Sequence, residues 1–178
     1  MMGKKLATVL VAAAVTLSGI AAFAPAAVEA ARLKAQVYIV QKRLPRKLTE
    51  RKLIAFARRN RAKILRETKE EKLDDRTWRG DLIVAFNRPV GDLEFQVLFY
   101  DIQDGPRRFV DDMATFVNDR SQKTFVQRLK LRRPKFKPNR QMQLVVTVKR
   151  QEVGRLKFNV VGQEKRRSGV VSFGDDET

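Results

Sequence analysis

The sequence predicts a mainly β fold: an antiparallel β-sandwich of immunoglobulin-like topology, with one long amphipathic helix between the first two strands. The first observation is a set of about seven or eight short segments in which apolar and polar residues alternate, with turn signals between them. The second is residues 92–100, where Leu93, Phe95, Val97 and Phe99 share one face. Four bulky apolar side chains on one face need a second layer to cover them, which predicts a packed sheet.

The first strand and the helix are predicted from the segment that starts at residue 33. Residues 33–40 alternate as a strand, and Pro45 ends it. Thr49 is then placed as an N-cap, and residues 50–72 contain neither Gly nor Pro and are rich in good helix formers. We therefore expect a helical insertion over about 49–72 that covers an edge or an open end of the core.

The middle of the chain predicts three strands. Residues 82–86 form an uninterrupted apolar run, which is typical of a strand covered on both faces. The turn at 87–91 leads directly into 92–100, so we expect these two strands to form an antiparallel pair. Residues 107–117 are ambiguous between helical and strand spacing, and a short strand with an irregular continuation is favoured.

The last third predicts a strand over 124–132, a loop stiffened by prolines over 133–140, and a hairpin. The hairpin joins 141–148 to 156–161 through a turn that contains Gly154. Residues 169–173 are compatible with a final short strand before an acidic tail at 175–178. No internal repeat is present, so residues 31–174 are expected to form one domain.

Residues 1–30 resemble a signal peptide. Lys4 and Lys5 precede an uncharged apolar run, and small residues precede an expected cut after Ala30. The alternative is an uncleaved membrane anchor, because the run is just long enough to span a bilayer. The chain has no cysteine, which excludes disulfides and a lipid-modified cysteine anchor. We expect an exported protein of the bacterial periplasm or cell surface.

The charge of the chain is strongly positive, with 38 Lys and Arg residues against 20 Asp and Glu residues and a net charge of +18. The excess lies in 32–79 and 123–167, whereas 80–122 is net acidic. Such a field attracts anionic polymers or surfaces. The alternative is a basic surface that only keeps the protein solvated.

The composition removes most catalytic chemistry. There is no histidine and no cysteine, so the usual general base, thiol nucleophile and zinc ligands are missing together. The remaining cluster is Asp101, Asp104, Asp111 and Asp112 around a loop. These four carboxylates could bind Ca²⁺ or serve a hydrolase, but the spacing does not match a calcium loop and arginines lie beside them. A turn-forming and salt-bridging role is expected, with no cofactor and no enzyme activity.

The basic surface is the strongest functional signal. Alternation turns Phe125, Leu129 and Leu131 inward and the basic residues of the same strand outward. The predicted contact residues are Arg128, Lys130, Arg132, Arg133, Lys135, Lys137 and Arg140, with Lys52, Arg59 and Lys63 on the flank of the helix.

These residues predict a non-catalytic binding protein whose partner is an anionic envelope polymer, a glycolipid or an acidic protein. Nucleic acid is disfavoured, because export removes it and the aromatic residues are expected to be buried rather than free to stack on bases. Membrane association is expected only peripherally or through an uncleaved signal. The alternative function is a structural or assembly subunit that acts through strand edges or helix contacts.

Overall fold

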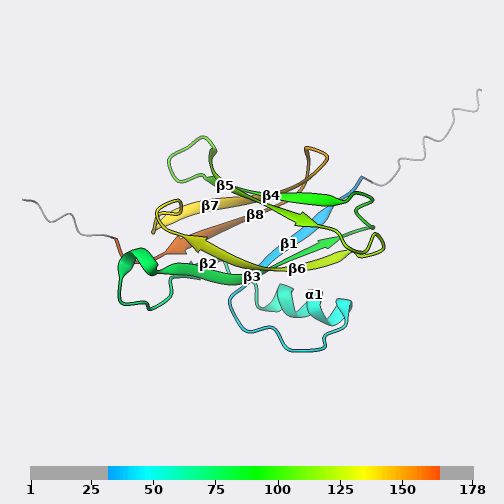
Figure 1. Cartoon of the computed structure of the whole chain (residues 1–178), viewed down its shortest axis with the longest axis horizontal. Helices are drawn as coiled ribbons and strands as arrows, with labels where there is room; N and C mark the ends of the chain where they lie inside the picture. Colours follow the sequence, from blue (N-terminus) through cyan, green and yellow to red (C-terminus); the bar gives the residue numbers. More distant parts are fainter. Residues whose placement is uncertain (1–31, 165–178) are drawn as a thin grey trace, which may run out of the picture. The chain divides into compact units, whose positions relative to one another are not determined.

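The computed structural model describes residues 32–164, which form two β-sheets and one α-helix (Figure 1). The elements are β1 (Ala35–Val40), α1 (Glu50–Arg59), β2 (Ile64–Arg66), the 3₁₀ helix η1 (Leu73–Asp75), β3 (Thr77–Phe86), β4 (Glu94–Asp101), β5 (Arg108–Phe116), β6 (Thr124–Arg132), β7 (Arg140–Val148) and β8 (Gln151–Val161). One sheet has the order β1-β3-β6 and the other β2-β8-β7-β4-β5. The mainly β prediction is confirmed.

A single apolar cluster fills the space between the two sheets. Phe86 of β3 and Phe125 of β6 come from the smaller sheet, and Phe95 of β4 comes from the larger one. Their rings meet edge to face, with centroids 5.1–5.8 Å apart. Aromatic pairs prefer this geometry, so the three rings hold the two layers together at one end of the core.

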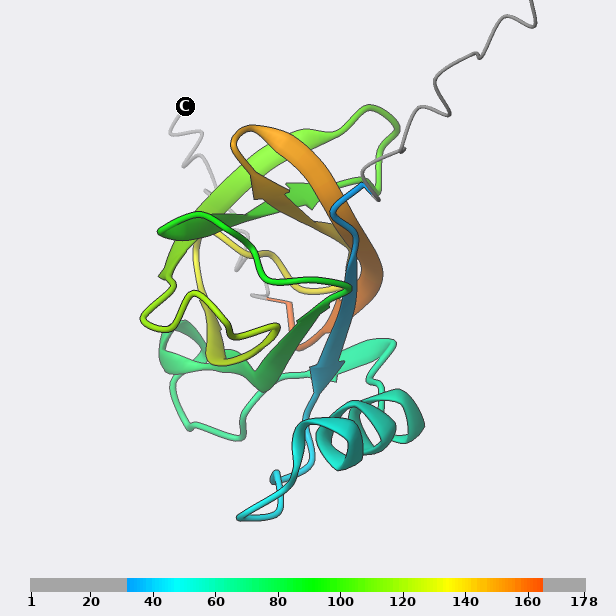
Figure 2. The same cartoon turned by 90° about the vertical axis from the view of Figure 1, so that its right-hand side faces the viewer.

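The helix is shorter than predicted. It spans Glu50–Arg59 and ends at Asn60, whose side chain and backbone both donate to the carbonyl of Phe56. It also packs on the outer face of the three-stranded sheet, and Figure 2 shows it beside β1. Ala57 of the helix belongs to one buried cluster with Tyr38 of β1 and Ile83 of β3. The expected position over an edge or open end of the core was therefore wrong. The prediction that 82–86 is covered on both faces is confirmed, because α1 covers the outer side.

Part of the predicted helical segment is a strand instead. Residues 64–66 form β2, which pairs with β8 in parallel and buries Leu65 completely. An isolated bridge from Glu67 to Trp78 links this segment to β3 of the other sheet. Burial of Leu65 and pairing with β8 override the helical propensity of the sequence, which is a weak preference beside tertiary contacts.

Three predictions about the middle strands were also wrong. β3 and β4 do not pair, because β3 lies between β1 and β6 while β4 lies between β7 and β5. The turn between them carries the chain from one sheet to the other. Residues 108–116 form a complete strand, β5, at the edge of the larger sheet. Leu93 precedes β4 and is 61% exposed, although Phe95, Val97 and Phe99 are buried as predicted.

The β7–β8 hairpin is confirmed, but its turn lies elsewhere. Lys149 and Arg150 form the turn, both with positive φ. Gly154 lies within β8 opposite Val146, at the point where the register shifts. A Cβ atom on Gly154 would come within 2.5 Å of the carbonyl oxygen of Ala35, so this glycine permits β1 to approach β8.

Three sequence predictions fall outside the described residues: the signal peptide at 1–30, the final strand at 169–173 and the acidic tail at 175–178. Within residues 32–164, α1 and η1 are both too short and too polar to cross a bilayer.

Candidate anion-binding surface

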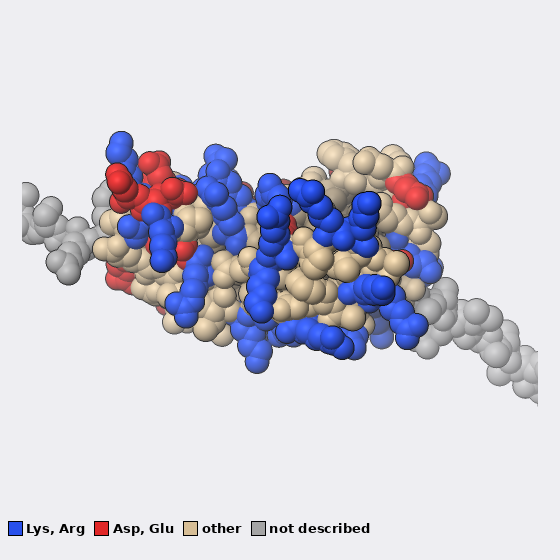
Figure 3. Space-filling model, turned by 90° about the horizontal axis from the view of Figure 1, so that it is seen from below, with Lys and Arg blue, Asp and Glu red and all other residues tan. Residues whose placement is uncertain are grey.

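The outer face of the three-stranded sheet has two halves. α1 covers one half, where Tyr38, Val40 and Ile83 are buried beneath it. The other half has no covering element among the described residues and bears charged side chains. Figure 3 views this side of the protein and shows Lys and Arg over much of the face, with acidic side chains mostly at one end and a smaller acidic patch near the other.

The basic row of β6 lies on the uncovered half. Arg128, Lys130 and Arg132 are exposed, and they alternate with Leu129 and Leu131, which are 2% exposed. The inward and outward assignment predicted for this strand is therefore confirmed. No carboxylate of residues 32–164 forms an ion pair with any of these three cations, although Asp81 of β3 lies opposite Arg128.

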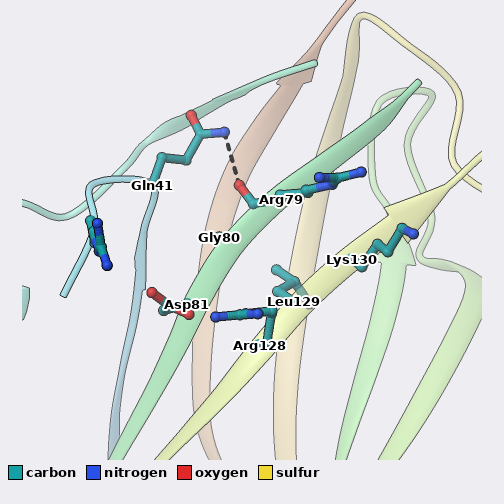
Figure 4. Close-up of a pocket in the computed structure, with 8 residues that line it drawn as sticks. Gln41, Arg79, Gly80, Asp81, Arg128, Leu129 and Lys130 are labelled. Atoms are coloured by element: carbon teal, nitrogen blue, oxygen red, sulfur yellow. Dashed lines mark hydrogen bonds between the residues drawn. The ribbon is translucent and has the colours of Figure 1, made fainter. Parts of the chain in front are cut away.

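A groove of about 690 Å³ runs beside this row (Figure 4). Its lining comes from the segment after β1, from β3 and from β6: Gln41, Arg43, Arg79, Gly80, Asp81, Arg128, Leu129 and Lys130. Gln41 fixes one wall, because its side-chain amide donates to the carbonyl oxygens of Arg66 at 3.1 Å and Arg79 at 3.0 Å. The amide of Arg66 donates in return to Gln41 Oε1, so Gln41 joins β2 to β3.

The register of β3 and β6 decides which charges face each other in the groove. Arg79 lies opposite Lys130, and Asp81 lies opposite Arg128. Arg79 forms an ion pair with Glu70, with Nη2 and Oε1 3.4 Å apart, and both side chains are about half exposed. The lining of the groove therefore combines three arginines and a lysine with one carboxylate, and a second carboxylate, Glu70, pairs with Arg79.

Arg133 does not belong to the exposed surface. Its Nη2 and the Glu67 carboxylate are 2.6 Å apart, and the two side chains are 9% and 5% exposed. The guanidinium also lies 5.5 Å from the centre of the Trp78 ring and donates to the carbonyl oxygen of Gln163. A second Glu67 oxygen accepts from the amide of Gln163. Arg133 is a structural cation, which corrects its assignment as a contact residue.

The other cations of the loop are mostly paired. Arg140 is held by Asp101, with Nε and Oδ2 2.8 Å apart, and by Asp104. The hydrogen bond from Arg140 lowers the pKa of the Asp104 carboxyl, and the bonds to Asp104 and Asp101 raise the pKa of Arg140. Lys135 pairs with Asp111 at 2.7 Å. Lys137 is exposed and forms no ion pair with another described residue.

Because α1 ends at Arg59, the three cations predicted to line one flank of the helix do not all lie on it. Lys52 and Arg59 are exposed on the helix, but Lys63 lies in the link to β2 and does not continue that flank. The carbonyl oxygen of Lys63 accepts from the amide of Asn159 on β8. The three residues are therefore exposed without forming one continuous row on a helix.

Three of the four aspartates of the 101–112 segment form ion pairs, which is the role expected from the sequence, and Asp112 forms none with another described residue. Asp101 and Asp104 pair with Arg140, and Asp111 pairs with Lys135. Within residues 32–164, no group of three or more acidic side chains is arranged to hold a metal ion. Phe136, which follows Lys135, is 3% exposed and packs edge to face on Phe99.

Sequence reasoning missed the β3 side of the groove. The strand was predicted to begin at Leu82, so Arg79 and Asp81 were not assigned to a face. Extending the two-residue period backward from Ile83 would have placed both on its outer side. The same period, extended forward along β6, would have turned Arg133 inward. Arg43 and Gln41 had no sequence signal, because their places depend on the path of the chain after β1.

No protein-family model matches this chain, and no curated protein matches it. Among solved structures, it is similar to an immunoglobulin-like protein from Pseudomonas aeruginosa, with 13% identity and a TM-score of 0.39 over 73% of this chain and 97% of that one.

Proposed function

We propose that this chain is an exported, non-catalytic binding protein of the bacterial envelope, which contacts an anionic polymer through the uncovered half of its three-stranded sheet. The observation that carries the proposal is the row of Arg128, Lys130 and Arg132, which is exposed and has no ion-pair partner in residues 32–164. Cations whose charge is not neutralised internally are available to replace the counterions of a polyanion.

The proposal includes an immunoglobulin-like β-sandwich, and the strand order supports it. In that fold the first, second and fifth strands share one sheet, and the third, sixth and seventh share the other. We count β2 as a detached part of the first strand. The smaller sheet, β1-β3-β6, then contains the first, second and fifth strands, and β4, β7 and β8 of the larger sheet are the third, sixth and seventh. Export remains an expectation from residues 1–30.

A charge-reversal triple tests the binding surface. Changing Arg128, Lys130 and Arg132 together to Glu should weaken binding to heparin, used here as a soluble linear polyanion. The slope of log affinity against log salt should become shallower by up to about three, because each lost contact releases about one counterion fewer. Titrations at several salt concentrations measure both quantities.

A second triple of reversals, at Lys52, Arg59 and Lys63, is the matched control for net charge. Charge reversal of the row on β6 should weaken heparin binding more than charge reversal of the control residues does, since the three control residues do not form one row. Equal losses would mean that only net charge matters. No loss with either triple would leave the basic surface as a solvation device and would overturn the proposal.

The assembly subunit is the second candidate, and it is favoured by the outer edge of β5, with which no strand of residues 32–164 pairs. Phe109 and Phe116 on this strand are 55% and 69% exposed. However, Val110 has no partner in the ladder with β4, and Asp111 and Asp112 follow it. Irregular pairing and charge are features that blunt edge strands against association. Apolar edge pairing should persist at high salt, whereas binding through the basic row should not.

A further inference from the structure

The β3–β6 ladder contains a juxtaposition that is unfavourable for the protein alone. Arg79 and Lys130 are directly opposite each other, and both side chains lie on the outer face. Directly opposed residues have Cβ atoms about 4.5–5.5 Å apart, and like charges at this position are destabilising. Glu70 compensates Arg79 in part, at 3.4 Å, but Lys130 has no ion-pair partner within residues 32–164. An anion between these two cations would relieve the repulsion.

The groove gives such an anion a defined place. Gly80 and Leu129, which form the next rung of the ladder, lie in its lining, and Arg43 comes from the segment after β1. In Figure 4, Arg79 and Lys130 extend from neighbouring strands toward one end, while Asp81 and Arg128 face each other at the other end. Arg79 and Lys130 are therefore separated from Asp81, the only carboxylate in the lining, although Glu70 forms an ion pair with Arg79 at this end.

We propose that this groove binds a phosphate group, held between Arg79 and Lys130. The inference deepens the proposed function and rests on it, because it assigns a ligand class to part of the same surface. A phosphate monoester carries about −1.5 to −2 charges at pH 7 and three acceptor oxygens, so it can accept from both cations at once. Arginine presents a planar fork suited to phosphate, and lysine adds a compact point charge.

Replacing Lys130 distinguishes a role in phosphate binding from a role in stabilising the sheet. The Lys130→Gln variant should bind inorganic phosphate at least about fivefold more weakly, while its melting temperature without ligand is equal to or above that of the wild type. Backbone NMR at constant ionic strength measures the affinity and shows whether β3 and β6 amides respond. Lys157→Gln, on an exposed outward position of β8, is the matched control and should leave phosphate binding unchanged.

A lower melting temperature for Lys130→Gln would show that Lys130 stabilises the sheet and would contradict the argument from repulsion. Equal phosphate affinities for Lys130→Gln and Lys157→Gln would overturn the site itself.

Replacing Asp81 should change the phosphate affinity in the opposite direction to replacing Lys130. The Asp81 carboxylate lies in the lining and repels an incoming dianion, so Asp81→Asn should tighten phosphate binding by several-fold at low salt. Because this gain is electrostatic and is screened by salt, the affinity of the variant should fall more steeply with salt concentration than that of the wild type. An unchanged or weaker affinity would count against a phosphate in this groove.

Two arms of the experiment distinguish the source of the phosphate. Inorganic phosphate in solution is compared with phosphatidylcholine vesicles made with and without phosphatidic acid. Saturable binding in either arm, weakened by Lys130→Gln, supports the site and identifies the source. The variant with Glu at positions 128, 130 and 132 separates the two proposals. If it binds heparin more weakly but phosphate binding does not depend on Lys130, the groove proposal fails and the proposed function stands. If heparin binding is also unaffected by the triple, both fail.

Discussion

Arg132 and Arg133 are consecutive arginines with opposite surroundings. Arg132 ends the outward row of β6 and is exposed, whereas Arg133 is buried against Glu67 and Trp78. The same division holds for the wider segment. The cations of β6 have no ion-pair partners among the described residues, whereas Arg133 and Lys135 of the following loop and Arg140 at the start of β7 have carboxylate partners. A continuous basic stretch in the sequence thus contains a binding surface candidate and a set of structural ion pairs.

The difference teaches that charge density alone does not locate a binding surface. A cation paired with a buried carboxylate has already given up its hydration, and its field is largely cancelled nearby. An exposed cation without a partner keeps its field and its counterions. The relevant quantity is therefore the charge left unpaired after folding, and by this measure Arg133, Lys135 and Arg140 do not belong to the candidate surface.

The largest expected effect comes from the arginine pair itself. Arg133→Ala leaves the Glu67 carboxylate buried without its partner and should lower the free energy of unfolding by about 3–5 kcal/mol. Arg132→Ala should change it by no more than about 0.5 kcal/mol. Urea denaturation of both variants measures the contrast. Similar losses would mean that the ion pair does not support the fold.

A second comparison concerns how the loop is anchored. Phe136→Ala removes a ring that is 3% exposed and packs on Phe99, which should cost about 3 kcal/mol. We expect the low end of the range for such changes because a surface loop can relax into the cavity. Lys137→Ala, at the neighbouring exposed position, is the control and should be nearly neutral. A destabilisation by Lys137→Ala that matches the loss from Phe136→Ala would show that the loop is not held by its aromatic residue.

The smallest effect is a pH dependence at Arg140. The Arg140 hydrogen bond lowers the folded-state pKa of Asp104 from its usual 3.8, so its stabilising contribution is complete above that value and is lost as pH falls through the folded pKa. In Arg140→Gln the Asp104 pKa should return toward 3.8, as followed by carboxyl carbon NMR. The destabilisation caused by Arg140→Gln should therefore shrink between about pH 6 and pH 2. A constant difference across this range would contradict the pairing.

The sequence determined the local features of this protein. A two-residue period is a property of consecutive residues, so it predicted the mainly β class, the inward faces of β4, β6 and β7, and the outward basic row. It also determined the net charge of +18 and, through the absence of histidine and cysteine, the chemistry that the chain lacks. Each of these conclusions needs only neighbours in the chain or a count of residues.

The tertiary structure decided everything that depends on residues far apart. Glu67 and Arg133 are separated by 66 positions, and Asp101 and Arg140 by 39, so no local pattern could show that these charges neutralise each other. The end of α1 at Arg59 follows from the pairing of β2 with β8, and the groove follows from the register that sets Arg79 opposite Lys130. Local preferences are weak beside burial and pairing, which is why long-range contacts determined where the unpaired charge lies.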